Sequence, residues 1–340
     1  MKKVGLLIIG FMLLIVMIGC SVQSGKENVD SEEISVEESG QVEEVLKENI
    51  DEKEIKKLTN EEVVKFQGKI ASGNNHIVGL KNDGTVIAVG ENDDGQCNIG
   101  KWKNIEKVSA EYCTLGLKND GTVVMTGSAK DDVSEWKDII QVSKGNRYIL
   151  GLKSDGTVIA SVDEGIEKYD LSGWKNIVQI SAAVNCLVGL RNDGTVVAAG
   201  VNRRGECDVS EWTDIVAVST SGNHTVGLKS DGTVVAAGSS GEGQCYVHEW
   251  TDIVAVSVNK LHTVGLKSDG TVVAVGYNGP SRMGTAIGYG QGLCNVSEWR
   301  DIVAISAGAM YTVGLKRDGT VVTVGGINGE KLELPRLWEN

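Results

Sequence analysis

The chain has 340 residues and a formal net charge of −13, and it contains 44 Gly but only 2 Pro. An acidic surface repels nucleic acid, whose phosphates require basic residues, so nucleic acid is excluded as a partner. The abundance of glycine favours a fold rich in tight turns and close backbone contacts.

The N-terminus has the pattern of an export signal. Lys2 and Lys3 precede an apolar run over 4–18, which is shorter than the about 20 residues of a membrane span but suits a signal peptide. Gly19-Cys20 resembles the bacterial lipobox, in which the cysteine is lipidated and becomes the new N-terminus, although Met17 replaces the usual leucine. We expect a signal peptide at 1–19 and a chain anchored outside the cytoplasm through lipid on Cys20. An uncleaved signal anchor is the alternative.

Residues 20–62 are rich in Glu and poor in large apolar side chains. Such a segment buries too little surface to fold, so we expect an extended acidic linker that connects the anchor to the folded domain. Thr59 and Glu62 have the spacing of a capping box, which predicts a short helix just before the domain.

A nine-residue phrase recurs seven times over 63–340, typified by Val226–Val234, in which Gly-Leu-Lys-Ser precedes Asp-Gly-Thr-Val. An Asp-Gly pair between two apolar runs is a strong hairpin signal. Successive Gly-Leu pairs are 35–38 residues apart, with one spacing of 49, and each unit carries one of the 7 Trp. The period indicates stacked supersecondary units.

Each unit is predicted to contain four short strands, illustrated by 253–257, 262–267, 271–275 and 294–296. The runs are β-branched and apolar on both faces, so neighbouring units must cover them. Seven four-stranded antiparallel units arranged radially form an all-β, seven-bladed β-propeller. The glycine before each Leu is expected to face a neighbour too close for a side chain.

The phrase Ser221–Leu228, followed by Asp231-Gly232-Thr233-Val234 and Gly238, resembles the regulator-of-chromosome-condensation repeat. Residues Gly90–Gln96 match its Gly-x-Asn-x-x-Gly-Gln segment, although Cys97-Asn98 replaces the Leu-Gly that usually follows. The resemblance implies a seven-bladed propeller and is greatest to secreted bacterial members, among them a propeller that inhibits β-lactamases. The exchange activity of nuclear members on a small GTPase is not carried over.

The residues that could carry chemistry recur at fixed repeat positions. His76, Cys113, Tyr148, Cys186, His224, His262 and Tyr311 share one position, and Cys97, Cys207, Cys245 and Cys294 share another. A position that accepts His, Cys or Tyr indicates packing rather than catalysis, so we expect no metal site and no cofactor. We expect six free thiols in the propeller, with a Cys207–Cys245 disulfide as the alternative.

The loops that vary between units mark the expected partner site. In an antiparallel meander the first and third connections emerge on one face, and loops on a rigid scaffold often carry function. We expect a monomeric, non-catalytic module that binds a protein or glycan of the envelope or of a host; an enzyme with its site in the central funnel is the alternative. The expected contact residues are Tyr112, Arg147, Arg203, Arg204, Lys260, Leu261, Arg282, Met283, Tyr289 and Met310.

Overall fold

The computed structural model describes residues 57–128, 132–162, 169–279, 292–326 and 332–338. They belong to one compact unit, Ile55–Asn340. The expected signal peptide, the lipidation site Cys20 and most of the expected linker lie outside the described residues. Among the residues that are described, no helix is long and apolar enough to cross a membrane.

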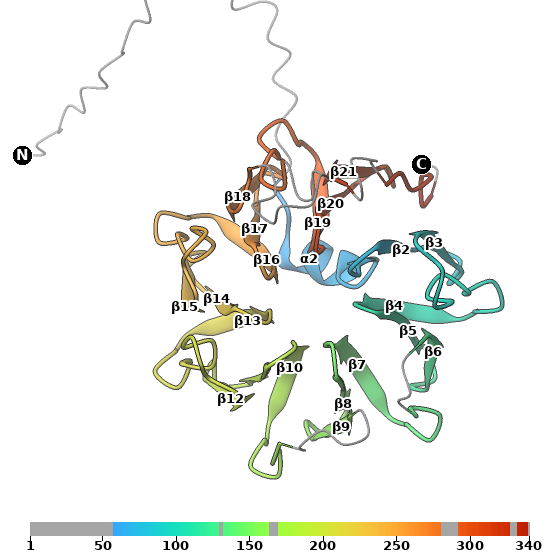
Figure 1. Ribbon diagram of the computed structural model, residues 1–340, viewed down its shortest axis with the longest axis horizontal. Helices are drawn as coiled ribbons and strands as arrows, with labels where there is room; N and C mark the ends of the chain where they lie inside the picture. The colour runs from blue at the N-terminus through green and yellow to red at the C-terminus, as the bar shows by residue number, and fades with distance from the viewer. Residues whose placement is uncertain (1–56, 129–131, 163–168, 280–291, 327–331, 339–340) are drawn as a thin grey trace, which may run out of the picture. The chain divides into compact units, whose positions relative to one another are not determined.

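The described residues form seven antiparallel sheets, each built from three consecutive strands with the second strand in the middle. Figure 1 shows them around a common centre, and the first strands contact each other from sheet to sheet in a closed ring that joins β19 back to β1. We call these sheets blades 1 to 7 and their strands inner, middle and outer. The seven-bladed propeller expected from the repeats is confirmed.

The strands have the following bounds. Blades 1 to 3 contain β1 (Ile70–Ser72), β2 (His76–Leu80), β3 (Val86–Gly90), β4 (Ile105–Ala110), β5 (Cys113–Lys118), β6 (Val123–Gly127), β7 (Ile139–Lys144), β8 (Tyr148–Lys153) and β9 (Val158–Val162). Blades 4 and 5 contain β10 (Ile177–Ala182), β11 (Cys186–Arg191), β12 (Val196–Gly200), β13 (Ile215–Thr220), β14 (His224–Lys229) and β15 (Val234–Gly238). Blades 6 and 7 contain β16 (Ile253–Asn259), β17 (His262–Lys267), β18 (Val272–Gly276), β19 (Ile302–Ala307), β20 (Tyr311–Lys316) and β21 (Val321–Gly325).

The expected fourth strand is wrong: in the described residues, the segments after the outer strands of blades 1 to 6 form turns. In blade 4 the side-chain Oδ1 of Asn202 accepts a hydrogen bond from the backbone N–H of Cys207 at 2.9 Å. The N–H of Asp208 bonds back to the carbonyl of Gly205 at 3.1 Å, and that of Val209 bonds to Cys207 at 2.9 Å. These local bonds use backbone groups that a fourth strand would have needed for pairing.

The hairpin between middle and outer strands forms as the Asp-Gly pairs predict. In blade 5 Gly232 has a φ of 81°, a region that glycine enters without steric cost. The carboxylate Oδ1 of Asp231 accepts hydrogen bonds from the N–H of Thr233 at 2.9 Å and from its hydroxyl at 2.6 Å. The Asp and the Thr of the phrase therefore have a shared structural role in closing the turn.

The middle strands form the buried layer of each blade, since every residue of β14 except Lys229 is buried. A Cβ on Gly227 would lie 2.8 Å from the ring of Trp212, and the equivalent glycines of blades 2 to 7 all face a Trp in this way. The expectation of a close neighbour at the Gly-Leu glycine is confirmed. In blades 2 to 7 the neighbour is the Trp of the link that precedes the inner strand. Its ring packs against the sheet as a wedge.

Neighbouring blades are joined at the inner strands by serine hydroxyls. The Oγ of Ser181 in blade 4 accepts a hydrogen bond from the N–H of Thr220 in blade 5 at 3.0 Å. The same bond is made at six of the seven junctions in the described chain, by Ser109, Ser143, Ser181, Ser219, Ser257 and Ser306. Ala71 holds the position in blade 1, so the junction from blade 1 to blade 2 lacks the hydroxyl.

A second contact joins the middle strands of neighbouring blades. The hydroxyl of Thr263 in blade 6 donates to the carbonyl of Gln244 at 2.7 Å, and its oxygen lies 2.8 Å from Nε2 of His224 in blade 5. The hydroxyl therefore accepts from an Nε2–H, which fixes the neutral tautomer of the histidine. His76 with Thr114 and His262 with Thr312 repeat the arrangement. The interpretation of these histidines as structural is confirmed.

In the described part of the chain, each sheet is built from consecutive strands, and the ring closes through contacts between blades 7 and 1. The hydroxyl oxygen of Tyr311 in blade 7 lies 2.7 and 2.6 Å from the carbonyl oxygens of Gly73 and His76 in blade 1. Leu337 takes the place of the Trp wedge, because a Cβ on Gly79 would lie 2.5 Å from its side chain. The seventh Trp, Trp338, differs from the other six in stacking on Phe66.

Helix α2 (Asn60–Phe66) supports this closure from the N-terminal side. It begins with the capping box expected at Thr59 and Glu62, which is confirmed. The helix contacts β16 and β19. Glu62 forms an ion pair with Arg317 in the hairpin turn of blade 7, so α2 is fixed to the last blade of the ring.

Acid should destabilise the propeller through its inter-blade histidines. Burial lowers the pKa of His76 and His224 to about 4 and that of His262 to about 3. The unfolded chain binds these protons at its ordinary pKa near 6.5, so stability falls as the pH drops from about 6.5 to 4. The loss should reach about 3 kcal/mol for each histidine. Urea unfolding at pH 7 and pH 4.5 measures it.

The matched variants are His224→Gln and His248→Gln. His224→Gln should flatten this pH dependence, because it removes one of the buried sites. His248 lies in a link, and its side chain is 77% exposed, so His248→Gln should leave the slope unchanged. Equal slopes in the wild type and His224→Gln would contradict the assignment.

Candidate functional site

The connections between strands gather on two faces of the propeller. The first connection joins inner to middle strand, and the third follows the outer strand. Backbone bonds join these two, such as Ser239 N–H to the carbonyl of Asn223 at 2.8 Å. The second connection, the Asp-Gly turn, bonds instead to the link that carries the Trp, as Ile253 N–H does to Gly232 at 3.0 Å. We call these the loop face and the turn face.

Backbone geometry fixes the sequence of the turn face. The pKa of Asp231 is lowered by hydrogen bonds from the side chain and backbone of Thr233, and the same Asp-Thr pair closes the other turns. In the links, Asp252 has a φ of 61°, and five equivalent Asp or Asn residues have nearly the same value. Asp and Asn tolerate this left-handed region better than other non-glycine residues. The turn face is therefore uniform for structural reasons.

The described residues of the expected partner site all lie on the loop face. Tyr112, Arg147, Arg203, Arg204 and Lys260 are exposed, whereas Leu261 and Met310 are half-buried. Met310 packs against the hydrophobic core that includes blade 7, so part of its expected contact area is already used. Arg282, Met283 and Tyr289 lie outside the described residues.

Arg204 is directed toward a first connection by its own contacts. Its Nη1 donates to the side-chain Oδ1 of Asn223 at 3.2 Å. Its backbone N–H donates to the carboxylate of Glu206 at 2.7 Å, and the side chain of Glu206 is fully buried. A third connection of blade 4 thus brings a guanidinium group to the first connection of blade 5.

A group of charged residues lies where the inner strands end; Lys260 was among the contact residues expected from sequence, whereas Glu111 and Lys144 were missed. Most of these ends carry small residues, such as Ser72-Gly73, Ala182-Ala183 and Ala307-Gly308. Glu111 in blade 2, Lys144 in blade 3 and Lys260 in blade 6 break this pattern. We call these three residues the axial cluster. Alignment of the seven inner-strand ends would have shown them as the charged exceptions.

Both lysines of the axial cluster act on the carboxyl group of Glu111. Burial raises the pKa of Glu111 to about 7, and the positive charges of Lys260 and Lys144 oppose this rise. Because blades 2 and 6 are not neighbours, the effect of Lys260 on Glu111 acts from one side of the ring to the other. The Glu111 carbonyl also accepts from the N–H of Asn74 at 2.8 Å, which ties the cluster to blade 1.

Lys144 and Lys260 are held in different ways. Lys144 is 5% exposed, and its ammonium group donates to the carbonyl of Asn146 at 3.2 Å. Lys260 is exposed, and its Cε would lie 3.6 Å from a Cβ placed on Gly222. The Lys144 ammonium group is thus held by the first connection of its own blade, and the Lys260 side chain lies beside the first connection of blade 5.

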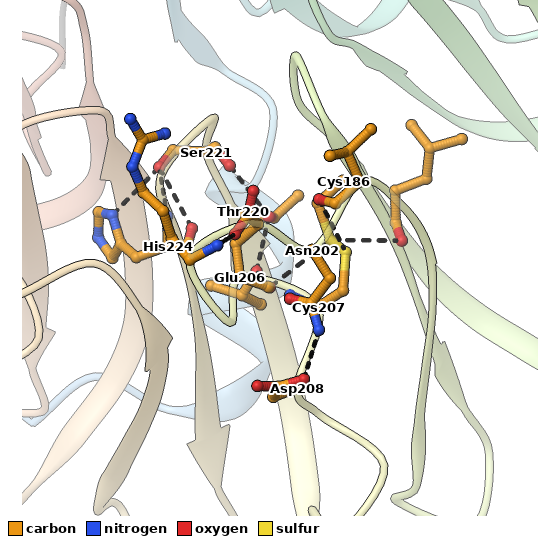
Figure 2. The surroundings of a disulfide bond; sticks show 12 residues. Cys186, Asn202, Glu206, Cys207, Asp208, Thr220, Ser221 and His224 are labelled. Atoms are coloured by element: carbon orange, nitrogen blue, oxygen red, sulfur yellow. Dashed lines mark hydrogen bonds between the residues drawn. A yellow bond between two sulfur atoms is a disulfide. The ribbon is translucent and has the colours of Figure 1, made fainter. Parts of the chain in front are cut away.

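The expectation of six free thiols is wrong, and so is the alternative Cys207–Cys245 pair. The structure joins Cys186 to Cys207 in a disulfide with a Cα–Cα distance of 6.1 Å (Figure 2). Sequence reasoning treated the two cysteine positions of the repeat as unrelated, but they lie side by side within one blade. Blade 4 has cysteine at both positions, and Cys97, Cys113, Cys245 and Cys294 remain as thiols.

Alkylation of the denatured, unreduced protein should therefore label four propeller cysteines and leave Cys186 and Cys207 unlabelled in a peptide map. The bridge spans 21 residues, so Cys186→Ala should lower the free energy of unfolding by about 3 kcal/mol through chain entropy. Cys294→Ala is the control for loss of a half-buried thiol and should cost less. Labelling of all six cysteines would disprove the bridge.

Comparison with known proteins identifies the repeat family that this sequence matches. Residues 69–96 and 215–244 match the model of the regulator of chromosome condensation (RCC1) repeat. No curated protein matches the chain.

Solved structures share the propeller. The CRINKLY WD40 ectodomain of the Arabidopsis thaliana receptor kinase ACR4 is 17% identical with a TM-score of 0.58, and the match covers 76% of this chain and 97% of that one. Prp20p of Saccharomyces cerevisiae, described with its binding to Gsp1p and histones, is 16% identical with a TM-score of 0.56, and the match covers 72% and 81%. At these identities the likeness shows the fold.

Proposed function

We propose that this chain, a β-propeller built from RCC1 repeats, is a non-catalytic binding module whose loop face holds a protein partner. The observation that carries the proposal is the division between the two faces. Backbone geometry accounts for the uniform turn face, whereas the loop face carries exposed Tyr112, Arg147 and Arg204. Tyr and Arg are the residue types that most often anchor interfaces.

A protein is favoured over a glycan because Prp20p, which shares the fold, is described as binding the proteins Gsp1p and histones. Their identities are not transferred to this chain. The partner we propose is a protein of the cell envelope or of a host, and a glycan is the other outcome that a binding screen distinguishes.

A binding module is favoured over an enzyme with its site in the central funnel, because the buried histidines already have structural roles in the ring. His76, His224 and His262 are kept neutral by burial and hydrogen-bonded between blades. Within the described ranges, no group of three His, Cys, Asp or Glu gathers that could hold a metal ion. The side chains that catalysis most often recruits are therefore engaged in holding the ring.

We also propose that the module is exported and anchored by lipid at Cys20. The support is the N-terminal sequence, with its basic start, its apolar run and Gly19-Cys20. The Cys186–Cys207 disulfide is consistent with an oxidising compartment outside the cytoplasm.

The loop-face proposal predicts an asymmetric alanine scan. Once a partner has been captured with the purified chain, Tyr112→Ala, Arg147→Ala or Arg204→Ala should weaken binding by about 1 kcal/mol or more, because anchors carry most of the energy. Lys229→Ala and Ser230→Ala, in a turn of the other face, should have little effect in the same calorimetric titration. Equal losses on both faces, or losses confined to the turn face, would overturn the assignment.

The anchor is tested separately, so that its failure leaves the loop face standing. Cells that express the wild-type chain should incorporate labelled palmitate into it, and the Cys20→Ala variant should lose the label and remain unprocessed. Cys113→Ala, which leaves the lipobox intact, should be labelled as the wild type is. A Cys20→Ala chain that is cleaved and labelled normally would refute the anchor.

A further inference from the structure

We infer that the axial cluster and the basic residues beside it form a binding site for an anionic group, a carboxylate or an inorganic oxyanion, at the centre of the loop face. The inference rests on the proposed function in that it names the chemistry the partner presents there. Its test needs no partner, so the two can fail independently.

The distribution of charge on the loop face supports this site. The chain as a whole has a net charge of −13, yet the first connections and inner-strand ends carry Lys144, Arg147 and Lys260 against the single carboxylate of Glu111. Arg204 adds a guanidinium group through its bond to Asn223. Acidic side chains of this face lie instead on third connections, which follow the outer strands: Glu91, Asp93, Asp94, Asp132, Asp170, Glu206, Asp208 and Glu242. The positive charge is therefore concentrated toward the axis.

The scaffold gives these charges a fixed arrangement. The backbone of Glu111 is bonded to blade 1 through Asn74, and that of Lys260 accepts from the side chain of Asn223 at 3.1 Å. The burial of Lys144 places its charge where water screens it weakly, so its field acts further than that of a surface lysine. Basic groups from blades 3, 4 and 6 are thus held on the same face of the ring, where an anion can accept charge-assisted hydrogen bonds from them.

Glu111 is the group that sets the charge of this site near neutral pH. The groups that face it are Lys144 from blade 3, Lys260 from blade 6, His76 from blade 1 and Tyr311 from blade 7, with Cys97 next to Tyr311. Burial keeps the pKa of His76 near 4 and raises those of Tyr311 and Cys97. With a pKa of about 7, the Glu111 carboxyl changes charge between pH 6 and pH 8.

The sign of the pH effect follows from this assignment. At pH 8 the Glu111 carboxylate is ionised and repels an incoming anion. At pH 6 it is mostly protonated, so the lysines act on the anion without that repulsion. Anion affinity should therefore rise as the pH falls through 7, by roughly fivefold.

The experiment is calorimetric titration of the purified full chain with sulfate, whose charge is constant over this range, and in parallel with a hexaglutamate peptide. Wild type should bind at least one probe more tightly at pH 6 than at pH 8. Glu111→Gln should bind that probe tightly at both pH values, and Lys260→Gln should weaken binding roughly fivefold. Lys229→Gln, which removes an equal charge from the turn face, should match the wild type. Binding of the peptide without sulfate would identify the carboxylate as the recognised group, and the reverse would identify the inorganic oxyanion.

Several results would overturn the site. The site is wrong if neither probe binds saturably at pH 6, or if the wild type binds with equal affinity at pH 6 and pH 8. It is also wrong if Glu111→Gln binds the probe more weakly than the wild type, or if Lys260→Gln and Lys229→Gln lose equal affinity. Thermal unfolding monitors folding of the variants, and Arg147→Gln is a second test because its side chain is exposed. If Tyr112→Ala disrupts partner binding while sulfate and hexaglutamate never bind, the proposed function stands and this inference falls.

Discussion

The hydrogen bond from one blade's backbone to the serine hydroxyl of the blade before it is the contact on which the ring depends. A three-stranded sheet has an open edge at its inner strand, and unpaired N–H groups there would be costly to bury. Serine supplies the missing acceptor at six junctions. Gln141 and Gln179 supply another, since their side chains accept from the inner strands of the next blades at 3.0 and 2.9 Å. Each blade thus needs its neighbour to complete its backbone hydrogen bonding.

This dependence explains why the repeats are so alike and where they are free to differ. Hydrophobic clusters form between adjacent blades, as when Val226 and Leu228 of blade 5 pack with Val258 of blade 6. The Trp wedge, the Asp-Gly turn and the serine must therefore fit together at each junction. The first and third connections take less part in these contacts. Arg204 and Lys260 lie in such connections, where a charged side chain is compatible with the ring.

The repeated parts of the molecule were predictable from sequence, because one physical requirement recurs in each unit. The Asp-Gly hairpins, the close approach at Gly227 and the capping box at Thr59 all follow from local chemistry. Contacts between different repeat positions were not predictable from sequence. The Cys186–Cys207 bridge joins two positions 21 residues apart within one repeat, and the pairing of His224 with Thr263 joins neighbouring positions of two successive repeats. Of the axial cluster only Lys260 was expected from sequence, since Glu111 and Lys144 come from blades far from it in the chain.

The closure of the ring has a consequence for how the chain reaches its native state. Phe66 is synthesised early and Trp338 late, so at translation rates of about 5–20 residues per second the two are separated by tens of seconds. Blades can assemble one on another as they are made, but the edge of blade 1 has no partner during that interval. Tyr311 and Leu337 complete that edge only when the last blade is in place. Premature release of the chain, or a translational stall within blade 7, would leave an open ring of blades. Its unpaired edges would then be available to associate with a second molecule.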